Sequence, residues 1–111
     1  MGAATFVRDG ERAELVTLNV EPRGQGLGSA LLQAWEEYVR EGGARRAELV
    51  TTNDNLDALR LYQRHGYRLM ALVVGAVDRA RRAKPAIPEH GEYGIALHDE
   101  LLLAKDLRRH P

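Results

Sequence analysis

Three glycines at alternate positions, Gly24, Gly26 and Gly28, stand at the start of a helical pattern in the stretch RGQGLGSALL. Glycine at a strand-to-helix junction permits a tight turn or the close approach of a ligand to the backbone. The amide groups at a helix N-terminus are open, and the helix dipole favours an anion there. This spacing therefore indicates either a plain turn or a site for an anion such as a pyrophosphate.

Two well-known phosphate-binding loops do not fit this stretch. A P-loop requires lysine and then serine or threonine after its last glycine, whereas Gly28 is followed by Ser29 and alanine. A dinucleotide-binding loop reads G-x-G-x-x-G, but the glycines here read G-x-G-x-G, and the acidic residue expected to close the next strand is missing. The loop alone predicts an anion site without naming the anion.

A second pattern lies downstream, spaced as N-x-x-A-x-x-L-Y-x-x-x-G-Y. Its members are Asn55, Ala58, Leu61, Tyr62, Gly66 and Tyr67. Together with the fit of Arg23, Gly26 and Gly28 to [RQ]-x-x-G-x-[GA], this order of motifs resembles the GNAT superfamily of N-acetyltransferases. The resemblance covers roughly residues 13–70 and extends more loosely to the C-terminal end.

The resemblance implies that acetyl-CoA is the co-substrate. The loop amides would hold its pyrophosphate, the end of the preceding strand would pair with the pantetheine arm, and Asn55 would contact the pantetheine or nearby backbone. The residues implied in cofactor binding are Leu18, Asn19, Val20, Arg23, Gly24, Gly26, Leu27, Gly28, Ser29 and Asn55.

Tyr62 is the residue that the resemblance implies as general acid for the departing thiolate. A tyrosine of ordinary pKa, near about 10, is protonated at neutral pH and can donate this proton. A tyrosine on a short helix is also explained as a core residue. The candidates for a general base are Glu14, Glu21 and Asp54, but solvated carboxylates explain each of them, so none is assigned.

The apolar pattern of the first half predicts a strand, a helix and a second strand. A turn at Asp9-Gly10 precedes an alternating run over residues 13–20, and the helical period of residues 27–40 ends at Gly42-Gly43. Trp35 on this helix is interpreted as a core residue. Another apolar run covers residues 47–51, so the two strands are expected to be parallel with a right-handed crossover.

The second half is expected to hold a short helix that Asp54 or Asn55 caps and Gly66 ends, followed by a strand over YRLMALVV. A helical turn over residues 78–84 and a loop over residues 90–94 follow. The tail IALHDELLLAKDL fits either a helix or a strand. The expected fold class is α/β (α+β), a GNAT-like mixed β-sheet with flanking helices that lacks the usual N-terminal strand and helices of the family.

Length, charge and composition limit the domain organisation and the possible partners of the protein. The 111 residues predict a single acetyltransferase-like domain, with an acetyl-CoA-binding core over about 13–70 and a C-terminal strand region over about 67–107. Sixteen basic and sixteen acidic residues give a formal net charge of zero, which argues against nucleic acid as partner. The four histidines have no metal-ligand spacing, so no metal is expected. Without an expected signal peptide or membrane span, the protein is expected in the cytoplasm.

The function expected from these patterns is acetyl-CoA-dependent transfer of an acetyl group to an unidentified amine. Because the sequence has no cysteine, transfer by direct attack in a ternary complex is favoured over an acyl-cysteine route. The alternative is a catalytically silent CoA-binding or protein-interaction module on a shortened version of the same fold. A sheet without the N-terminal arm would expose an edge and part of an apolar face, which predicts a homodimer.

Overall fold

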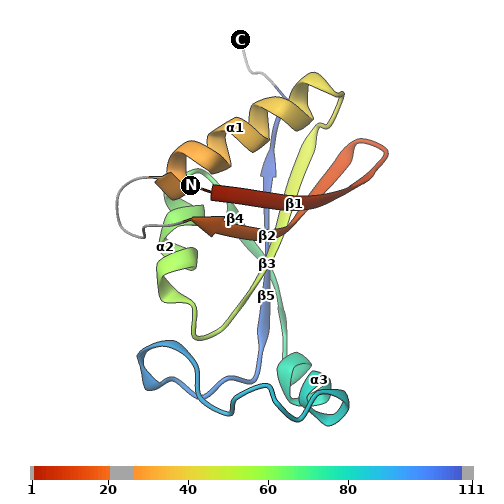
Figure 1. The fold of residues 1–111 in the computed structure, drawn as a ribbon. Coiled ribbons are helices and arrows are strands. Elements are labelled where there is room, and N and C mark those ends of the chain that lie inside the picture. Colours follow the sequence, from red (N-terminus) through yellow and green to blue (C-terminus); the bar gives the residue numbers. More distant parts are fainter. Residues whose placement is uncertain (1, 21–26, 109–111) are drawn as a thin grey trace. The chain divides into compact units, whose positions relative to one another are not determined.

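The computed structural model describes residues 2–20 and 27–108 (Figure 1). Its elements in chain order are β1 (Gly2–Asp9), β2 (Arg12–Val20), α1 (Leu27–Glu41), β3 (Arg46–Thr52), α2 (Leu56–Arg64), β4 (Arg68–Val73), α3 (Ala76–Ala83), the 3₁₀ turn η1 (Glu92–Gly94) and β5 (Glu100–Asp106). The strands form one sheet in the order β1-β2-β3-β5-β4. The expected mixed sheet with helices is confirmed.

The chain divides into two compact units. Unit 1 consists of Met1–Leu49 with Ala104–Pro111, and unit 2 consists of Val50–Leu103. The boundary falls within β3 and again within β5, so both strands belong to both units. The glycine loop therefore belongs to unit 1, whereas Asn55 and Tyr62 belong to unit 2.

Unit 1 begins with a hairpin of β1 and β2. Its turn contains Gly10 with φ of 60°, a left-handed conformation that glycine adopts without steric cost. The strands are antiparallel, and a shift in register between Thr5 and Phe6 places Phe6 opposite Leu15. On its other side β2 pairs with β3 in parallel, from Arg12 opposite Arg46 to Leu15 opposite Leu49. The expected parallel pair is thus present.

Helix α1 packs against β1 and β2 and covers one face of this part of the sheet. Leu32, Trp35 and Val39 recur at intervals of three or four residues and are buried, together with Leu15 on the strand. The ring of Phe6 meets Trp35 edge to face, with 6.0 Å between the centroids. Trp35 is a core residue, as expected.

The end of α1 also lies where the sequence indicates. The amide of Gly42 donates to the carbonyl of Tyr38 at 3.2 Å, and that of Ala44 donates to the carbonyl of Val39 at 2.9 Å. Gly43, with φ of 99°, takes the left-handed conformation that commonly ends a helix. The two glycines therefore turn the chain from α1 toward β3.

Unit 2 opens with the short helix α2. The side-chain oxygen of Asn55 accepts a hydrogen bond from the amide of Ala58 at 3.2 Å, which makes Asn55 the N-cap. Gly66, with φ of 91°, follows the last turn. Tyr62 is the residue of this helix that is buried. The helix, its cap and its end all agree with the expectation from the sequence.

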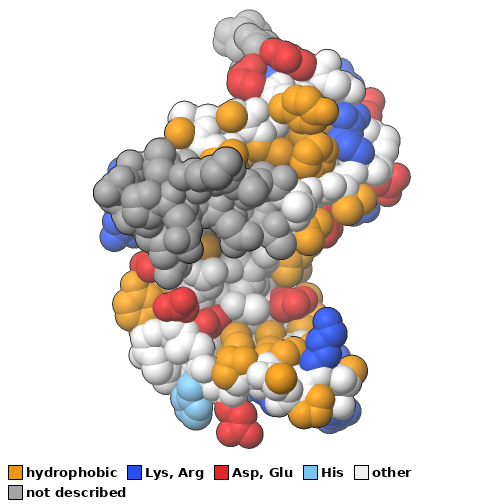
Figure 2. All heavy atoms as spheres, viewed as in Figure 1, with side chains coloured by type: hydrophobic (Ala, Val, Ile, Leu, Met, Phe, Trp, Pro, Cys, Tyr) orange, Lys and Arg blue, Asp and Glu red, His pale blue; other side chains and the backbone are white. Residues whose placement is uncertain are grey.

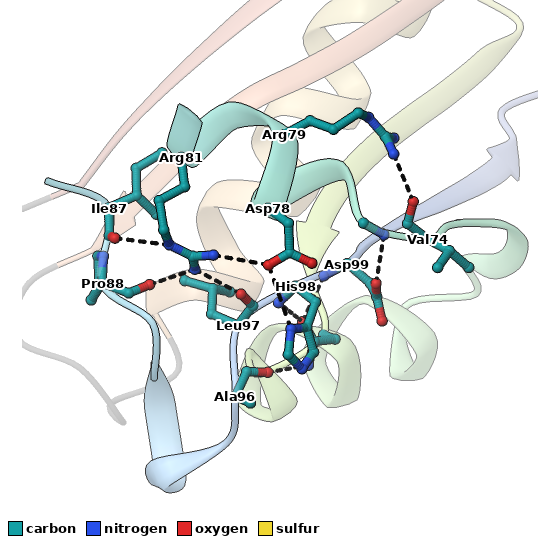
Figure 3. Close-up of polar contacts among 12 residues, drawn as sticks. Val74, Asp78, Arg79, Arg81, Ile87, Pro88, Ala96, Leu97, His98 and Asp99 are labelled. Atoms are coloured by element: carbon teal, nitrogen blue, oxygen red, sulfur yellow. Dashed lines mark hydrogen bonds and ion pairs between the residues drawn. The ribbon is translucent and has the colours of Figure 1, made fainter. Parts of the chain in front are cut away.

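Helix α3 and the segment after it are joined by Arg81. Its guanidinium donates to the carbonyl oxygens of Ile87, Pro88 and Leu97, at 3.1, 2.7 and 2.8 Å, and also to Asp78 at 2.9 Å (Figure 3). The sequence predicts a helical turn over residues 78–84, whereas the helix begins earlier, at Ala76. It can begin there because Gly75 takes a left-handed conformation as its N-cap.

Within the ambiguous C-terminal tail, Glu100–Asp106 form the strand β5. In the sheet order it lies between β3 and β4, so both of its edges are paired. Leu103 and Ala104 on this strand are buried. A central position in a sheet rewards apolar side chains on both faces, which explains why the leucine-rich run becomes a strand rather than a helix.

Candidate functional site

The predicted pyrophosphate site lies at the start of α1. The helix begins at Leu27, so Gly28 and Ser29 lie in its first turn and are half-buried. No acidic residue lies in this turn. A helix N-terminus of this kind favours an anion, because its first amides lack intrahelical partners and the dipole is positive there. Arg23, Gly24 and Gly26 lie outside the described residues.

The predicted pantetheine strand is the last part of β2. Leu18, Asn19 and Val20 are in strand conformation, opposite Ala4, Ala3 and Gly2 of β1. These three residues lie beyond Leu15, where the described parallel pairs with β3 reach their last member. The backbone expected to meet pantetheine is therefore an extended segment, as that role requires. Pairing with a ligand stays a prediction.

Asn55 has an observed structural role as the N-cap of α2. In addition to its side-chain contact with Ala58, its carbonyl accepts from the amide of Leu59 at 3.0 Å. Asn55 is half-buried. Its predicted contact with pantetheine is not tested by these bonds, which account for the side-chain oxygen and not for the amide nitrogen.

Tyr62 lies in the last part of α2 and is 9% exposed. Its ring is tilted against that of Tyr67, with 6.1 Å between the centroids and 59° between the planes. Burial raises the pKa of the Tyr62 hydroxyl above its ordinary value. The hydroxyl thus stays protonated across the neutral range, as a proton donor must, although the same burial also suits a core residue.

Asp54, one of the three base candidates, is tightly held. Its Oδ1 accepts from the hydroxyl of Thr52 at 2.5 Å, and its Oδ2 accepts from the amide of Glu92 at 2.8 Å. Asp54 is only 5% exposed, and a Cβ on Gly91 would lie 2.0 Å from its Oδ2. Both carboxylate oxygens are engaged, so Asp54 fixes the turn at Glu92 to the end of β3.

Glu14 lies opposite Glu48 in the parallel register of β2 and β3. Glu14 is half-buried, whereas Glu48 is buried between two arginines. Arg12 Nη1 lies 3.2 Å from Glu48 Oε1, and Arg46 Nε lies 2.8 Å from Glu48 Oε2. These ion pairs compensate the burial of the Glu48 carboxylate. The third candidate, Glu21, lies outside the described residues.

Several features of this region are not apparent from the sequence. The burial of Glu48 depends on the register that brings Arg12 and Arg46 to it, and a strand pattern alone does not give that register. The fit of Gly91 against Asp54 joins residues far apart in the chain. The hydroxyl of Tyr93 donates to Asp57 Oδ1 at 2.5 Å, and Tyr93 has a positive φ of 59°. No short motif marks these contacts.

The described part of the chain contains no cluster of side chains suited to bind a metal ion. Among residues 2–20 and 27–108, no group of three or more histidine, cysteine, aspartate or glutamate side chains could hold a metal ion. His98 lies 3.6 Å from Asp78, a single pair. In the same residues, no helix has both the length and the apolar character needed to span a bilayer.

Comparison with known proteins agrees with the fold and the motifs. A sequence model of the Acetyltransferase (GNAT) family matches residues 1–67, which is more than half of the chain. The chain therefore belongs to the GNAT acetyltransferase family. The family resemblance that the two motifs carry is confirmed.

Individual relatives match most of the chain or part of it. The uncharacterized Bacillus subtilis protein YdhI is 42% identical over 105 residues, which cover 95% of this chain and 66% of YdhI. An aminoalkylphosphonate N-acetyltransferase of Salmonella typhimurium is 48% identical over 59 residues, 53% of this chain and 38% of that protein. The structure of a Bacillus subtilis acetyltransferase in complex with CoA matches with a TM-score of 0.84 and 25% identity, covering 95% of this chain and 68% of that one. The chain thus spans about two thirds of the length of YdhI.

Proposed function

We propose that this chain is an acetyl-CoA-dependent N-acyltransferase that transfers an acetyl group to an amine by direct attack in a ternary complex. The observation that carries the proposal is Tyr62, which stands at the tyrosine position of the family motif, is buried, and has a raised pKa. The solved relative with bound CoA and the relative named as an N-acetyltransferase support the choice of co-substrate and acceptor class.

The start of α1 fits a bound pyrophosphate, because its first turn has no acidic side chain to repel one. In the proposed complex the amides of residues 24 and 26–29 hold the pyrophosphate, with Arg23 nearby. The backbone of Leu18, Asn19 and Val20 aligns the pantetheine arm, and Asn55 contacts it through the part of its amide that does not cap α2. When bound, acetyl-CoA supplies the acetyl thioester.

Tyr62 has the chemical role in the proposed reaction. As the amine nitrogen bonds to the acetyl carbon and the carbon–sulfur bond breaks, the hydroxyl of Tyr62 gives its proton to the leaving sulfur. Donation by a positioned acid contributes roughly 100-fold or more to the rate. The proton of the amine leaves through water or a carboxylate. Asp54 is poorly suited to accept the proton of the amine, because both of its carboxylate oxygens already accept hydrogen bonds.

A catalytically silent CoA-binding module is the second candidate, and one observation favours it. The side chain of Asn55 caps α2 and the ring of Tyr62 packs against Tyr67, so both motif residues also have structural roles. The two candidates differ in turnover and not in binding. As further parts of the proposal, we place the protein in the cytoplasm and expect it to form a homodimer.

The decisive experiment compares Tyr62→Phe with Tyr67→Phe, which changes the neighbouring buried ring. Calorimetric titration gives the affinity for acetyl-CoA and CoA, and a thiol reagent follows CoA release against a panel of amines. Because the chain has no cysteine, the reagent reports the released thiol alone. We expect Tyr62→Phe to lower kcat by about 100-fold or more with little change in acetyl-CoA affinity, and Tyr67→Phe to retain most of the turnover.

Each other outcome has a definite meaning. Binding of acetyl-CoA without turnover on any amine would support the silent module. Full turnover by the Tyr62→Phe variant would remove Tyr62 as the general acid. Absence of binding to either form of CoA would overturn both candidates.

A further inference from the structure

Strand β4 is an edge strand with its side chains exposed on both faces. It stands last in the sheet order, next to β5. All six of its residues are exposed, and Leu69, Met70, Leu72 and Val73 each expose 42 to 56% of their surface. Since successive side chains of a strand point to opposite faces, apolar surface is open on both sides of β4.

Natural proteins rarely leave such an edge unprotected. Charged side chains, prolines and bulges normally prevent an edge strand from pairing with another chain. The first strand in the sheet order, β1, has charged residues at Arg8 and Asp9 and an irregular register after Thr5. By contrast, β4 has the sequence RLMALV, in which Arg68 at its start is the single charge. The chemistry of β4 therefore favours pairing rather than preventing it.

We propose that β4 is a self-association surface, on which two copies of this chain pair their β4 strands antiparallel about a two-fold axis at Ala71. Residues that face each other across an antiparallel pair lie on the same face of the sheet. When the two strands are identical and related by a two-fold axis, facing residues lie on the same face only if the axis passes through a residue and not between two residues. An axis at Ala71 places the smallest side chain of the strand at the centre of the pairing, where Ala71 of one copy faces the same residue of the other copy.

This register makes the strand complementary to itself. Met70 faces the partner subunit's Leu72 on one side of the sheet, and Leu69 faces the partner subunit's Val73 on the other. Arg68 faces the partner subunit's Val74, so no like charges meet across the strands. The formal net charge of the chain is zero, so two copies do not repel each other as whole molecules. A second copy is therefore the occupant that the strand fits.

The size of the strand sets the expected strength of the association. Six residues of β-strand extend over about 20 Å. This edge supplies less than the roughly 800 Å² per partner of a standard stable interface. We therefore expect a reversible dimer, with a dissociation constant in the micromolar range, rather than a permanent one. The proposal deepens the homodimer of the proposed function and does not depend on the acyl-transfer chemistry.

Sedimentation equilibrium from about 1 to about 500 µM chain tests the surface. The variants Met70→Lys and Leu72→Glu each place one charge against an apolar partner, and we expect each to weaken dimerisation by about tenfold or more. The double variant M70K/L72E places a lysine opposite a glutamate twice across the axis. We expect it to recover part of the affinity and, unlike the wild type, to lose it again as salt is added.

Val7→Lys on β1 is the matched control, because Val7 is exposed to 58% on the other terminal strand of the sheet. It should dimerise as the wild type does, and circular dichroism should show all variants folded. A wild type that remains monomeric throughout overturns both the homodimer and this surface. A dimer that the single β4 variants leave intact, or a double variant no better than the singles, overturns this surface and register while the homodimer stands.

Discussion

The two units of this chain are stabilised by different interactions. In unit 1, apolar side chains of α1 such as Leu32 and Val39 are packed against buried strand residues such as Leu15. In unit 2, fewer of the described apolar residues are buried. The side chain of Asn53 holds a loop there through hydrogen bonds to backbone groups, and that of Arg81 does the same (Figure 3). Hydrophobic side chains also reach the surface among charged ones around α3 (Figure 2). The stability of unit 1 therefore depends on the close packing of apolar side chains, and the stability of unit 2 depends on the hydrogen bonds of a few polar side chains.

The two buried carboxylates on and after β3 show a second difference between the units, in how tightly polar contacts hold a buried charge. Glu48 is paired with two arginines whose side chains are 45 and 49% exposed, so part of its environment is water. Asp54 is held by neutral donors, the Thr52 hydroxyl and the amide of Glu92, and no space remains for a side chain at Gly91. A partly solvated ion pair can adjust to a substitution, whereas the Asp54 contacts leave little room for adjustment.

The largest effect on stability is expected from Leu32→Ala in unit 1. Leu32 is fully buried on the inner face of α1, and truncation of such a leucine removes packing and leaves a cavity. We expect the free energy of unfolding to fall by about 2–5 kcal/mol, measured by urea denaturation. Leu31→Ala, at a half-buried position next to it, should cost less than half as much. Equal losses at the two positions would contradict a core built by α1.

Gly91→Ala is the corresponding test for unit 2. The new Cβ would lie 2.0 Å from Asp54 Oδ2, so the carboxylate has to move and its hydrogen bonds weaken. We expect a loss of about 2 kcal/mol in the free energy of unfolding. In an Asp54→Ala background the same substitution should cost at least about 1 kcal/mol less, because the colliding oxygens are gone. Strictly additive losses in this double-mutant cycle would show that Asp54 is not what excludes a side chain at Gly91.

The elements whose signals are local follow directly from the sequence. Helix α1 is predicted because its apolar residues recur every three or four positions and Gly42-Gly43 end it. Asn55 is likewise recognisable as a cap of α2, since capping involves only the next few residues. The motif positions of Asn55 and Tyr62 belong to the same class, because each is defined by spacing within one helix.

The features that the sequence does not predict depend on contacts between residues far apart in the chain. The tail over residues 95–107 is compatible with a helix until β3 and β4 provide pairing partners on both sides of β5. The close fit of Gly91 to Asp54 and the burial of Glu48 between Arg12 and Arg46 likewise arise from chain pairing and not from local pattern. Tertiary contacts decide between local preferences of similar strength.

The smallest of these effects on stability compares two arginines of α3. Arg81 donates to three carbonyl oxygens and to Asp78, and its side chain is 19% exposed. Arg79 is exposed and donates to the carbonyl of Val74 at 3.0 Å. We expect Arg81→Met to lower the free energy of unfolding by about 1–2 kcal/mol, because the carbonyls lose a charged donor. Arg79→Met should change it by less than about 0.5 kcal/mol.

Hydrogen exchange adds a local measurement to this pair of variants. The amide of Leu97 donates to the carbonyl of Glu89, within the segment that Arg81 fastens. Loss of Arg81 should therefore speed the exchange of the Leu97 amide, while Arg79→Met leaves it protected. If the two variants behave alike in stability and in exchange, the segment after α3 is held by its own backbone bonds, and unit 2 depends less on polar side chains than its contacts indicate.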